Sequence, residues 1–354
     1  MRLTFVLPDW VQHPIGGYKI AYEYATRLAA RGHEVTVVHA RPPAAGLRAR
    51  ARNRARRSLL EVRGVGWFSL PPSVKIVLAT MGDTASLPPG DAIVATAWVT
   101  ARFVSEAPAS RGRRYYLIQH YETWDAPASE IDATWRLPMR KIVIARWLFA
   151  NGVRLLGSDD DLRYIPNAID TDEFKVIVPI ADRDPFTAAM LYHPARWKGT
   201  QDGLDALEMA RERAPTLSAI LFGTPARPPD LPPWITYRRS PVGSELCRLY
   251  NSVAIFIHPS HAEGWPLPPA EAMASGCALV AATNPGVMDY TRSDRNALTA
   301  SVGNPAGLAA QLTRVATEDS LRLALANQGV SDMKGYTWSR AVDGMEAVLA
   351  EVVP

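Results

Sequence analysis

The stretch "HAEGWPLPPAEAMASGCALVAA", residues 261–282, places two glutamates, Glu263 and Glu271, on either side of a proline pair. The residues before it, 253–260, are a continuous apolar run that stops at a proline, which is typical of a short buried strand. The proline pair at 268–269 suits the first turn of a helix, where a missing N–H costs nothing. We therefore expect Glu263 in a loop at the carboxyl end of a strand, and Glu271 in the first turn of the next helix.

Two carboxylates at one strand-to-helix junction repel each other, so their charge needs compensation. Carboxylates accept hydrogen bonds in pairs, which makes the vicinal hydroxyls of a ribose or a hexose natural partners. The N–H groups of a helix N-terminus suit a phosphate, and a nucleotide sugar carries both kinds of group. Ligands of open α/β sheets bind at this edge. For Glu271 alone, the alternative is a favourable interaction with the helix dipole, which needs no ligand.

The composition is that of a globular protein with more than one core. The chain has 354 residues, of which 47% are hydrophobic and 21% charged, and its net charge is +4. This length favours two domains, and so modest a charge does not by itself imply nucleic acid. The two cysteines, Cys247 and Cys277, exclude a disulfide framework and indicate a reducing compartment. No run approaches the roughly 20 apolar residues of a membrane span, so we expect a cytoplasmic protein.

Strand and helix patterns alternate along both halves of the chain, which predicts mainly parallel sheets covered on both faces. A segment without clear periodicity near 173–186 separates the two halves, and a last amphipathic helix is expected at 339–353. Within residues 14–40 we expect a glycine loop at Gly16–Gly17, then a helix, then a strand. Two more helices are expected at 203–214 and 244–251. The other expected strands are 3–8, 91–98, 114–120, 141–145, 188–194, 217–223 and 278–282.

An arginine-rich stretch at residues 41–63 interrupts this alternation and carries no strand signal. Its plainest interpretation is a solvated charge run. It also suits a contact with an acidic acceptor, or, through residues 48–57, a peripheral contact with anionic lipid at the inner face of a membrane.

The motif and its context resemble the retaining, nucleotide-sugar-dependent glycosyltransferases of family 4. The Gly16–Gly17 loop followed by "LAARGHEVTVV" (28–38) and the stretch "YIPNAID" (164–170) are similar to further segments of that family. The "IQHYETW" segment (118–124) is similar to its rhamnosyltransferase-like branch. The residues that carry the main motif are Glu263, Gly264, Leu267, Pro268, Glu271, Ala272, Met273, Ala274 and Gly276.

This resemblance implies the GT-B fold, which consists of two Rossmann-like, doubly wound α/β domains that face a central cleft. The N-terminal, acceptor-side domain is expected at 1–172, with a C-terminal helix, 337–354, that crosses back to it. The nucleotide-sugar-binding domain is expected at 173–336. No metal or cofactor is implied, and no nucleic-acid partner.

The resemblance also implies roles for residues of the second domain. Glu271 should hold the ribose hydroxyls and Glu263 the donor hexose, with Gly264 and Leu267 beside them. The family binds the donor diphosphate with an arginine and a lysine, because a leaving diphosphate develops negative charge that cations must meet. Lys198 matches the lysine. His193 falls at the usual spacing of the arginine and Arg196 lies in a different register, so these two remain alternatives.

In the first domain the resemblance points to a glycine pair and a histidine. Gly16 and Gly17 would let the backbone approach the phosphates closely, although an ordinary tight turn explains them as well. His120 follows an apolar strand and would face the donor sugar near C1. Its alternative is a hydrogen-bonded structural histidine. The predicted catalytic residues are therefore His120, Glu263 and Lys198, and the predicted donor-binding residues are Gly16, Gly17, Arg196, Lys198, Glu263, Gly264, Leu267 and Glu271.

These inferences predict a metal-independent, retaining glycosyltransferase that uses a nucleotide-diphosphate sugar and a hydroxyl of a glycan, lipid-linked or small-molecule acceptor. Three alternatives remain. A GT-A transferase would hold a metal through an Asp-x-Asp motif, which "DDD" (159–161) and "DTD" (170–172) match literally. A nucleotide-sugar epimerase or a sugar phosphorylase would keep the fold and change the reaction. A non-catalytic protein would bind a nucleotide sugar or an anionic partner on the same fold.

Overall fold

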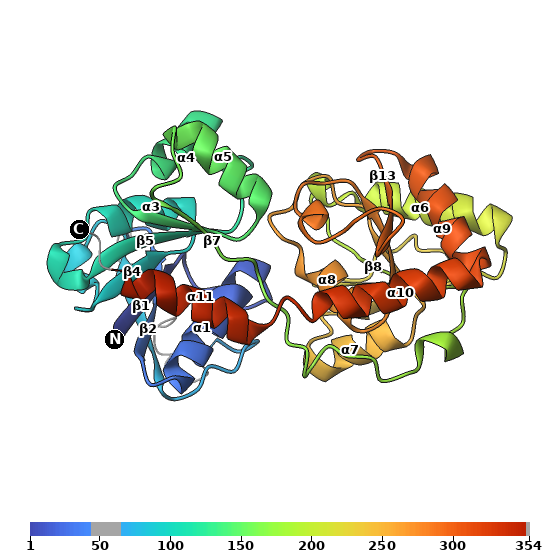
Figure 1. Cartoon of the computed structure of the whole chain (residues 1–354), viewed down its shortest axis with the longest axis horizontal. Coiled ribbons are helices and arrows are strands. Elements are labelled where there is room, and N and C mark those ends of the chain that lie inside the picture. The colour runs from blue at the N-terminus through green and yellow to red at the C-terminus, as the bar shows by residue number, and fades with distance from the viewer. Residues whose placement is uncertain (44–64, 352–354) are drawn as a thin grey trace. The chain divides into compact units, whose positions relative to one another are not determined.

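The computed structural model describes residues 1–43 and 65–351, which form two compact units (Figure 1). One unit is Met1–Pro166 with Val342–Pro354, and the other is Asn167–Ala341. The sequence prediction placed these divisions at 172/173 and 336/337. Most of the arginine-rich stretch, including residues 48–57, lies outside the described residues, so its interpretations stay predictions. No helix in the described part of the chain is long and apolar enough to cross a lipid bilayer.

The first unit is built on a seven-stranded sheet with the order β3-β2-β1-β4-β5-β6-β7, in which all neighbours are parallel. Its central strands are buried along almost their whole length, which explains why they read as apolar runs. The strands are β1 (Arg2–Leu7), β2 (Glu34–Arg41), β3 (Val74–Thr80), β4 (Ala92–Ala95), β5 (Arg113–Ile118), β6 (Arg140–Val143) and β7 (Leu162–Tyr164). The helices are α1 (Gly16–Ala30), α3 (Trp98–Ser105), α4 (Ala128–Trp135) and α5 (Arg146–Leu156), and α11 (Trp338–Ala350) begins in the second unit and continues into this one.

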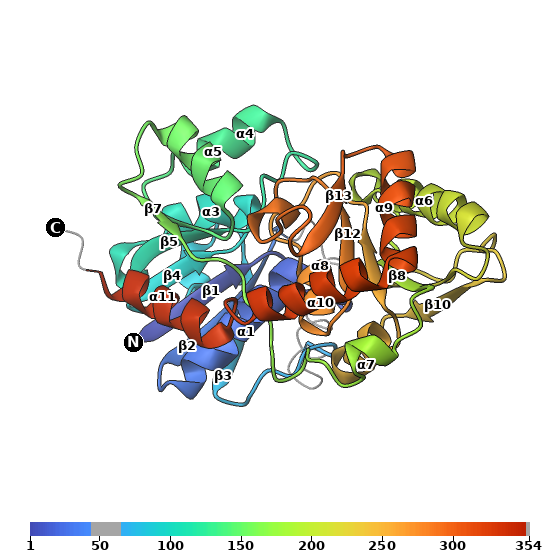
Figure 2. The ribbon, with the colours of Figure 1, turned by 45° about the vertical axis from the view of Figure 1, so that its right-hand side comes forward.

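The second unit is built on a six-stranded parallel sheet with the order β10-β9-β8-β11-β12-β13. Helices α6 and α9 lie side by side over one face (Figure 2), where they pack on Ile255 and Ile257 of β11. Tyr250 of α7 packs on Phe256 at the other face. The strands are β8 (Thr187–Leu191), β9 (Ser218–Gly223), β10 (Ile235–Arg239), β11 (Ile255–His258), β12 (Ala278–Ala282) and β13 (Ala297–Ala300). The helices are α6 (Thr200–Arg213), α7 (Gly243–Asn251), α8 (Leu267–Ala274), α9 (Pro305–Thr317) and α10 (Asp319–Met333).

The order of the second sheet reverses between β8 and β11. From β8 the chain crosses to β9 on one side, whereas β11 and the strands after it build the other side. The loops that follow β8 and β11 therefore leave the carboxyl edge of the sheet next to each other. Such a switch point is where open α/β sheets bind ligands.

The predicted doubly wound α/β architecture is confirmed for both units, but the starts of two helices were predicted wrongly. Helix α8 begins at Leu267, so the prolines occupy its first turn and Glu271 lies beyond that turn. Gly16 and Gly17 are the first residues of α1 rather than a loop before it. In both cases the helix starts earlier than predicted. The prediction was wrong because prolines and glycines, which are tolerated in a first helical turn, are also common in loops.

Several strands and helices in the described residues carried too little sequence signal to be predicted. Strand β10 lies at the edge of its sheet and is largely exposed, so its sequence reads as polar. Strand β7 has only three residues. Among the unpredicted elements are β3, β7, β10, β13, α3, α4, α9 and α10.

Arg183 ties several segments of the second unit together, although nothing in the sequence singled it out. The side chain is 5% exposed, and burial lowers the pKa of its guanidinium. Its five N–H donors match an unusual number of acceptors. These are the carbonyl oxygens of Val178 (3.0 Å), Tyr250 (3.4 Å), Val253 (3.2 Å) and Ser275 (2.6 Å) and the side-chain oxygen of Asn251 (2.9 Å).

Replacing Arg183 with methionine should destabilise the second unit, because it leaves several buried carbonyl groups without a donor. We expect Arg183→Met to lower the free energy of unfolding by about 3 kcal/mol or more. The matched control is Arg295→Met, whose side chain is 65% exposed and pairs with Asp332 at 3.7 Å, and which should cost less than about 1 kcal/mol. Urea titration of both variants measures the difference, and equal losses would contradict a structural role for Arg183.

Candidate functional site

The loops after β8 and β11 bring Lys198 and Glu263 together. Lys198 ends a short helical turn, Arg196–Lys198, and Gly199 follows it in the left-handed conformation (φ 60°). A Cβ atom on Gly199 would overlap the carbonyl oxygen of Pro259, the first residue after β11. Glycine is therefore required here both by the backbone angle and by the close approach of the two loops.

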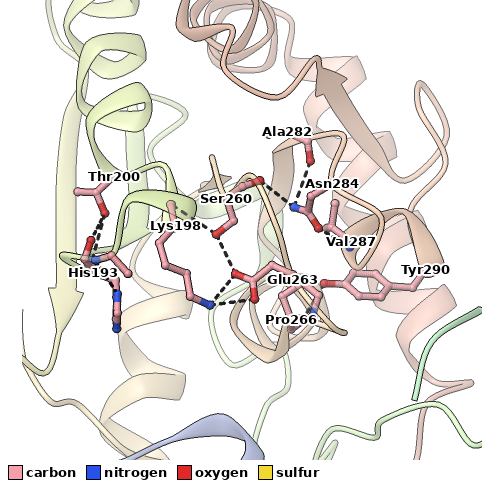
Figure 3. Close-up of polar contacts among 11 residues, drawn as sticks. His193, Lys198, Thr200, Ser260, Glu263, Pro266, Ala282, Asn284, Val287 and Tyr290 are labelled. Carbon is pink, nitrogen blue, oxygen red and sulfur yellow. Dashed lines mark hydrogen bonds and ion pairs between the residues drawn. The ribbon is translucent and has the colours of Figure 1, made fainter. Parts of the chain in front are cut away.

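Lys198 and Glu263 form a two-pronged ion pair (Figure 3). The Nζ atom of Lys198 lies 2.8 Å from Oε1 and 2.9 Å from Oε2 of Glu263, and the hydroxyl of Ser260 donates to Oε1 at 2.8 Å. Burial alone would raise the pKa of Glu263, but the charge of Lys198, together with His258 and the hydrogen bonds, holds that pKa below its usual range. Glu263 is thus an ionised carboxylate and an acceptor only.

The loop after β12 holds the Glu263 loop from the other side (Figure 3). The side-chain amide of Asn284 donates to the carbonyl oxygen of Ser260 at 3.0 Å, and its Oδ1 accepts from the backbone N–H of Val287 at 3.0 Å. The hydroxyl of Tyr290 donates to the carbonyl oxygen of Pro266 at 2.9 Å. These bonds fix the backbone before and after Glu263, so its carboxylate has a defined position.

Gly286 lets the loop after β12 pack directly on the backbone of Glu263. A Cβ atom at this position would lie 2.5 Å from the carbonyl oxygen of Glu263 and 2.8 Å from that of Gly264. The backbone angles of Gly286 are those of a right-handed helix (φ −70°, ψ −45°), so the requirement for glycine is one of space alone.

Gly286→Ala should therefore push the two loops apart and lower the free energy of unfolding by about 1–3 kcal/mol. Gly329→Ala, a change inside α10, is the matched control, because the added Cβ atom would only make ordinary contacts with Met273 of α8, at 3.4 Å and beyond. That change should be neutral or stabilising. Chemical denaturation of the two variants tests the expectation, which fails if Gly286→Ala is as stable as the wild type.

Glu271 lies on α8 and is 4% exposed. Its Oε2 accepts a hydrogen bond from the hydroxyl of Tyr250 at 3.3 Å. Burial, and next the charge of Glu271, raise the pKa of Tyr250 well above its usual value, so the phenol stays protonated and donates. Because Glu271 lies beyond the first turn, its interpretation as a first-turn partner of the helix dipole no longer applies.

The remaining predicted residues of the second unit lie around this pair. Gly264 is buried directly after Glu263, and Leu267 is the first residue of α8. Arg196 is exposed and forms no ion pair with any described residue. His193 is held by Thr200, whose hydroxyl accepts from the backbone N–H of His193 and donates to its carbonyl oxygen. Burial lowers the pKa of His193, and the charge of Lys198 lowers it further. His193 is therefore neutral and does not offer a positive charge to a phosphate.

The predicted residues of the first unit lie at the carboxyl edge of its own sheet. The ring of His120, after β5, meets those of Trp124 and Trp147 edge-on at 4.5 Å and 5.6 Å. Gln119 donates to the carbonyl oxygen of Gly17 at 3.1 Å. The structure thus brings the start of α1 next to the segment that contains His120.

Several residues around Glu263 were missed by the sequence analysis. Ser260 and Asn284 each come two positions after a central strand, β11 and β12, and a polar residue at that position is a signal that was available. Tyr290, which supports the loop through Pro266, was not singled out either. For Tyr250 and the buried His258, nothing in the pattern marks a site.

Neither stretch that matches Asp-x-Asp belongs to a group of three possible metal ligands in the described part of the chain. The Oδ1 atom of Asp170 accepts from the backbone N–H groups of Asp172 (3.0 Å) and Glu173 (3.2 Å), so "DTD" is a hydrogen-bonded turn. In residues 1–43 and 65–351, no three His, Cys, Asp or Glu side chains are grouped so that they could hold a metal ion.

A pocket of about 790 Å³ opens beside the loop after β8, on the side of α6. Neither Lys198 nor Glu263 lines it, and most of its charged groups are carboxylates. Among the described residues, Arg196 is the one arginine that lines it, so a diphosphate inside the pocket would meet mainly carboxylates, which repel it. Its acidic residues are Asp202, Asp205, Glu208 and Asp230.

Comparison with known proteins finds similarity to glycosyltransferases. Residues 185–318, which include Lys198, Glu263 and Glu271, match the family described as glycosyl transferases group 1. The D-inositol 3-phosphate glycosyltransferase of Actinosynnema mirum is 29% identical over 109 residues, 31% of this chain and 26% of that protein. The enzyme of the same name from Salinispora arenicola is 30% identical over 111 residues, 31% and 25% of the two chains. The chain spans about a quarter of the length of these curated relatives.

Solved structures resemble the whole chain. Anabaena HepE in complex with UDP-glucose matches with a TM-score of 0.75 and 15% identity over 99% of this chain and 100% of that one. Staphylococcus aureus TarM, solved with Fondaparinux, alpha-GlcNAc-glycerol and UDP, matches with a TM-score of 0.77 and 8% identity over 99% and 100%. At these identities the likeness concerns the fold, which is that of the GT-B glycosyltransferases, and the predicted fold class is confirmed.

Proposed function

We propose that this chain, whose residues 185–318 form a glycosyl transferases group 1 domain, is a retaining, metal-independent glycosyltransferase of family 4. It moves a sugar from a nucleotide-diphosphate sugar to an acceptor hydroxyl. The observation that carries the proposal is the Lys198–Glu263 pair with the buried Glu271 on the next helix. One ammonium and two carboxylates lie near the switch point of a parallel sheet, where they match the diphosphate and the two sets of hydroxyls of such a donor.

Each of these groups has a separate task in donor binding. Glu271 accepts hydrogen bonds from the ribose hydroxyls, and Glu263, held ionised by its neighbours, accepts from the donor hexose. The ammonium of Lys198 has three N–H donors, so it can turn from Glu263 towards a diphosphate. The positive N-terminal end of α6, which follows Lys198 directly, supports the same negative charge.

The chemistry needs stabilisation of the leaving diphosphate. Its negative charge grows as the bond to the sugar breaks, and a cation already positioned by the fold meets that charge without reorganising. Lys198 supplies this cation, while Arg196, which is exposed, is free to reach the outer phosphate. His120 is assigned to the donor sugar near C1 on the grounds of the family resemblance. The acceptor is a glycan, a lipid-linked sugar or a small molecule.

Two other functions use the same residues differently. A non-catalytic binding protein would bind the nucleotide sugar without turnover, and an epimerase would alter the sugar without an acceptor. The resemblance to the rhamnosyltransferase-like branch favours a deoxyhexose donor, and HepE, solved with UDP-glucose, favours a uridine nucleotide.

A thermal unfolding screen with UDP, GDP, dTDP, ADP and their sugar conjugates tests the donor site. A ligand at 100 times its dissociation constant stabilises the folded protein by about 2.7 kcal/mol, and we expect one nucleoside diphosphate to give most of the shift. Glu271→Gln should weaken binding of that nucleotide by about 10- to 100-fold. Glu263→Gln should lose mainly the increment that the sugar adds. The control is Glu318→Gln, whose side chain is 49% exposed and should bind as the wild type does.

Failure of every nucleotide to stabilise folded protein would contradict the donor site. Binding without transfer to any acceptor and without release of free nucleoside diphosphate would instead favour the binding protein. Conversion of the sugar with no transfer would favour the epimerase.

Lys198→Met should lower turnover more than donor binding, because the diphosphate gains charge towards the transition state. We expect kcat to fall by about 10²- to 10³-fold with a smaller change in donor affinity. Lys334→Met, a change of an exposed lysine after α10, serves as the control and should leave both quantities unchanged. The wild type should work equally well in EDTA, and loss of activity that a divalent ion restores would contradict the metal-independent mechanism.

A further inference from the structure

His258 is a buried histidine beside the proposed donor site. It is the last residue of β11, it pairs with Ala281 of β12, and it is 4% exposed. Since Ile255 and Ile257 face α6 and α9, the alternation along the strand turns His258 to the opposite face of the sheet.

The ring of His258 makes no hydrogen bond with any described residue, and its Nε2 atom has no contact with solvent. Buried polar atoms are almost always bonded, so an exception calls for a physical reason. His39, the buried histidine of the first unit, shows the ordinary case. Its two ring nitrogens lie 3.3 Å from the carbonyl oxygen of Pro8 and 3.2 Å from the hydroxyl of Tyr22.

Two charged groups act on His258. Burial lowers its pKa to about 4, the carboxylate of Glu263 raises it, and the ammonium of Lys198 lowers it. Glu263 in turn responds to both Lys198 and His258. The three side chains therefore form one electrostatic cluster, in which Lys198 is the counter-ion of Glu263 and His258 is neutral at pH 7.

A bound diphosphate would change how the negative charge of Glu263 is compensated. The ammonium of Lys198 then bonds to phosphate oxygens, and Glu263, whose side chain is only 10% exposed, loses much of its counter-ion. A buried carboxylate without a counter-ion is unfavourable, and no other cation of the described residues lies within ion-pair distance of Glu263.

We propose that His258 is a positioning residue that takes up a proton from solvent when a nucleoside diphosphate binds, and then offsets the charge of Glu263 in place of Lys198 from beyond the distance of a direct ion pair. The proton adds to a ring nitrogen that is unbonded in the free protein, and it returns to solvent when the nucleotide leaves. This inference rests on the proposed function, because it requires a diphosphate at Lys198. It explains why a strand end in the core carries an imidazole with no partner.

The inference fixes the sign of a pH dependence. The pKa of His258 must be higher in the complex than in the free protein, where it is about 4. The complex then binds more protons, so nucleotide affinity strengthens as the pH falls from 7.5 towards 5.5.

One test needs no ligand. Removing the charge of Lys198 with Lys198→Met should raise the pKa of His258 by about one to three pH units, as measured by NMR titration of the imidazole signals. Adding Glu263→Gln should reverse that rise. The pKa of His39, in the other unit, is the internal control and should not move. An unchanged pKa of His258 in folded Lys198→Met would overturn the inference.

A second test measures the proton directly. Calorimetric titration with UDP, GDP and ADP, in buffers of different ionisation enthalpy at pH 6, should show that the wild type takes up more protons on binding than His258→Asn. The affinity of the wild type should also gain about three- to tenfold over that of the variant between pH 7.5 and 5.5. The phosphate of the nucleotide titrates in the same range, but it does so identically with both proteins.

These measurements distinguish a failure of the role of His258 from a failure of the proposed function. Nucleotide binding with equal proton uptake in the wild type and His258→Asn would overturn the role of His258 and leave the proposed function intact. No binding of any nucleotide to the folded wild type would overturn both. If His258→Asn does not fold, the NMR test decides, because it leaves His258 in place.

Discussion

The ion pair between Lys198 and Glu263 links the two loops at the switch point of the second unit, and the rest of the site is built around it. It joins the loops after β8 and β11, the two strands between which the order of the sheet reverses. A partly buried ion pair adds little net stability, because desolvation offsets most of its attraction. The hydrogen bond from Ser260, and the support that Asn284 and Tyr290 give to the loop, therefore serve to define a position. The fold thus holds the carboxylate of Glu263 in one place, as its proposed role in donor binding requires.

Close packing of backbone around the pair sets a second constraint. Gly199 and Gly286 bring three loops to distances that a single Cβ atom would prevent. Farther from the site, Arg183 binds the segment before β8 to the ends of α7 and α8. Helix α8 carries Glu271, so the buried arginine also stabilises the position of the second carboxylate. The site thus depends on residues that do not themselves face a ligand.

The sequence predicted those parts of the protein that local pattern determines. Strands buried on both faces read as apolar runs, and this gave the doubly wound architecture and the strands that precede the site. Lys198 and Glu263 are 65 residues apart, so their contact follows from the crossover of the sheet and not from any spacing. The start of α8 was misplaced because prolines suit both a loop and a first turn. Whether His258 is buried, and whether its ring is bonded, depends on packing from distant segments.

The two glutamates of the opening motif show how structure assigns different tasks to the same chemical group. Their mutual repulsion requires compensation, and the fold provides it in two ways. Glu263 receives an ammonium and a hydroxyl, whereas Glu271 receives the hydroxyl of a phenol that burial keeps protonated. Oε1 of Glu263 already accepts from both Lys198 and Ser260, and in the proposed function Lys198 turns towards the diphosphate, which leaves both carboxylate oxygens with more capacity for sugar hydroxyls. In the proposed function, sugar recognition at Glu263 is therefore coupled to the position of Lys198, the cation assigned to the leaving group.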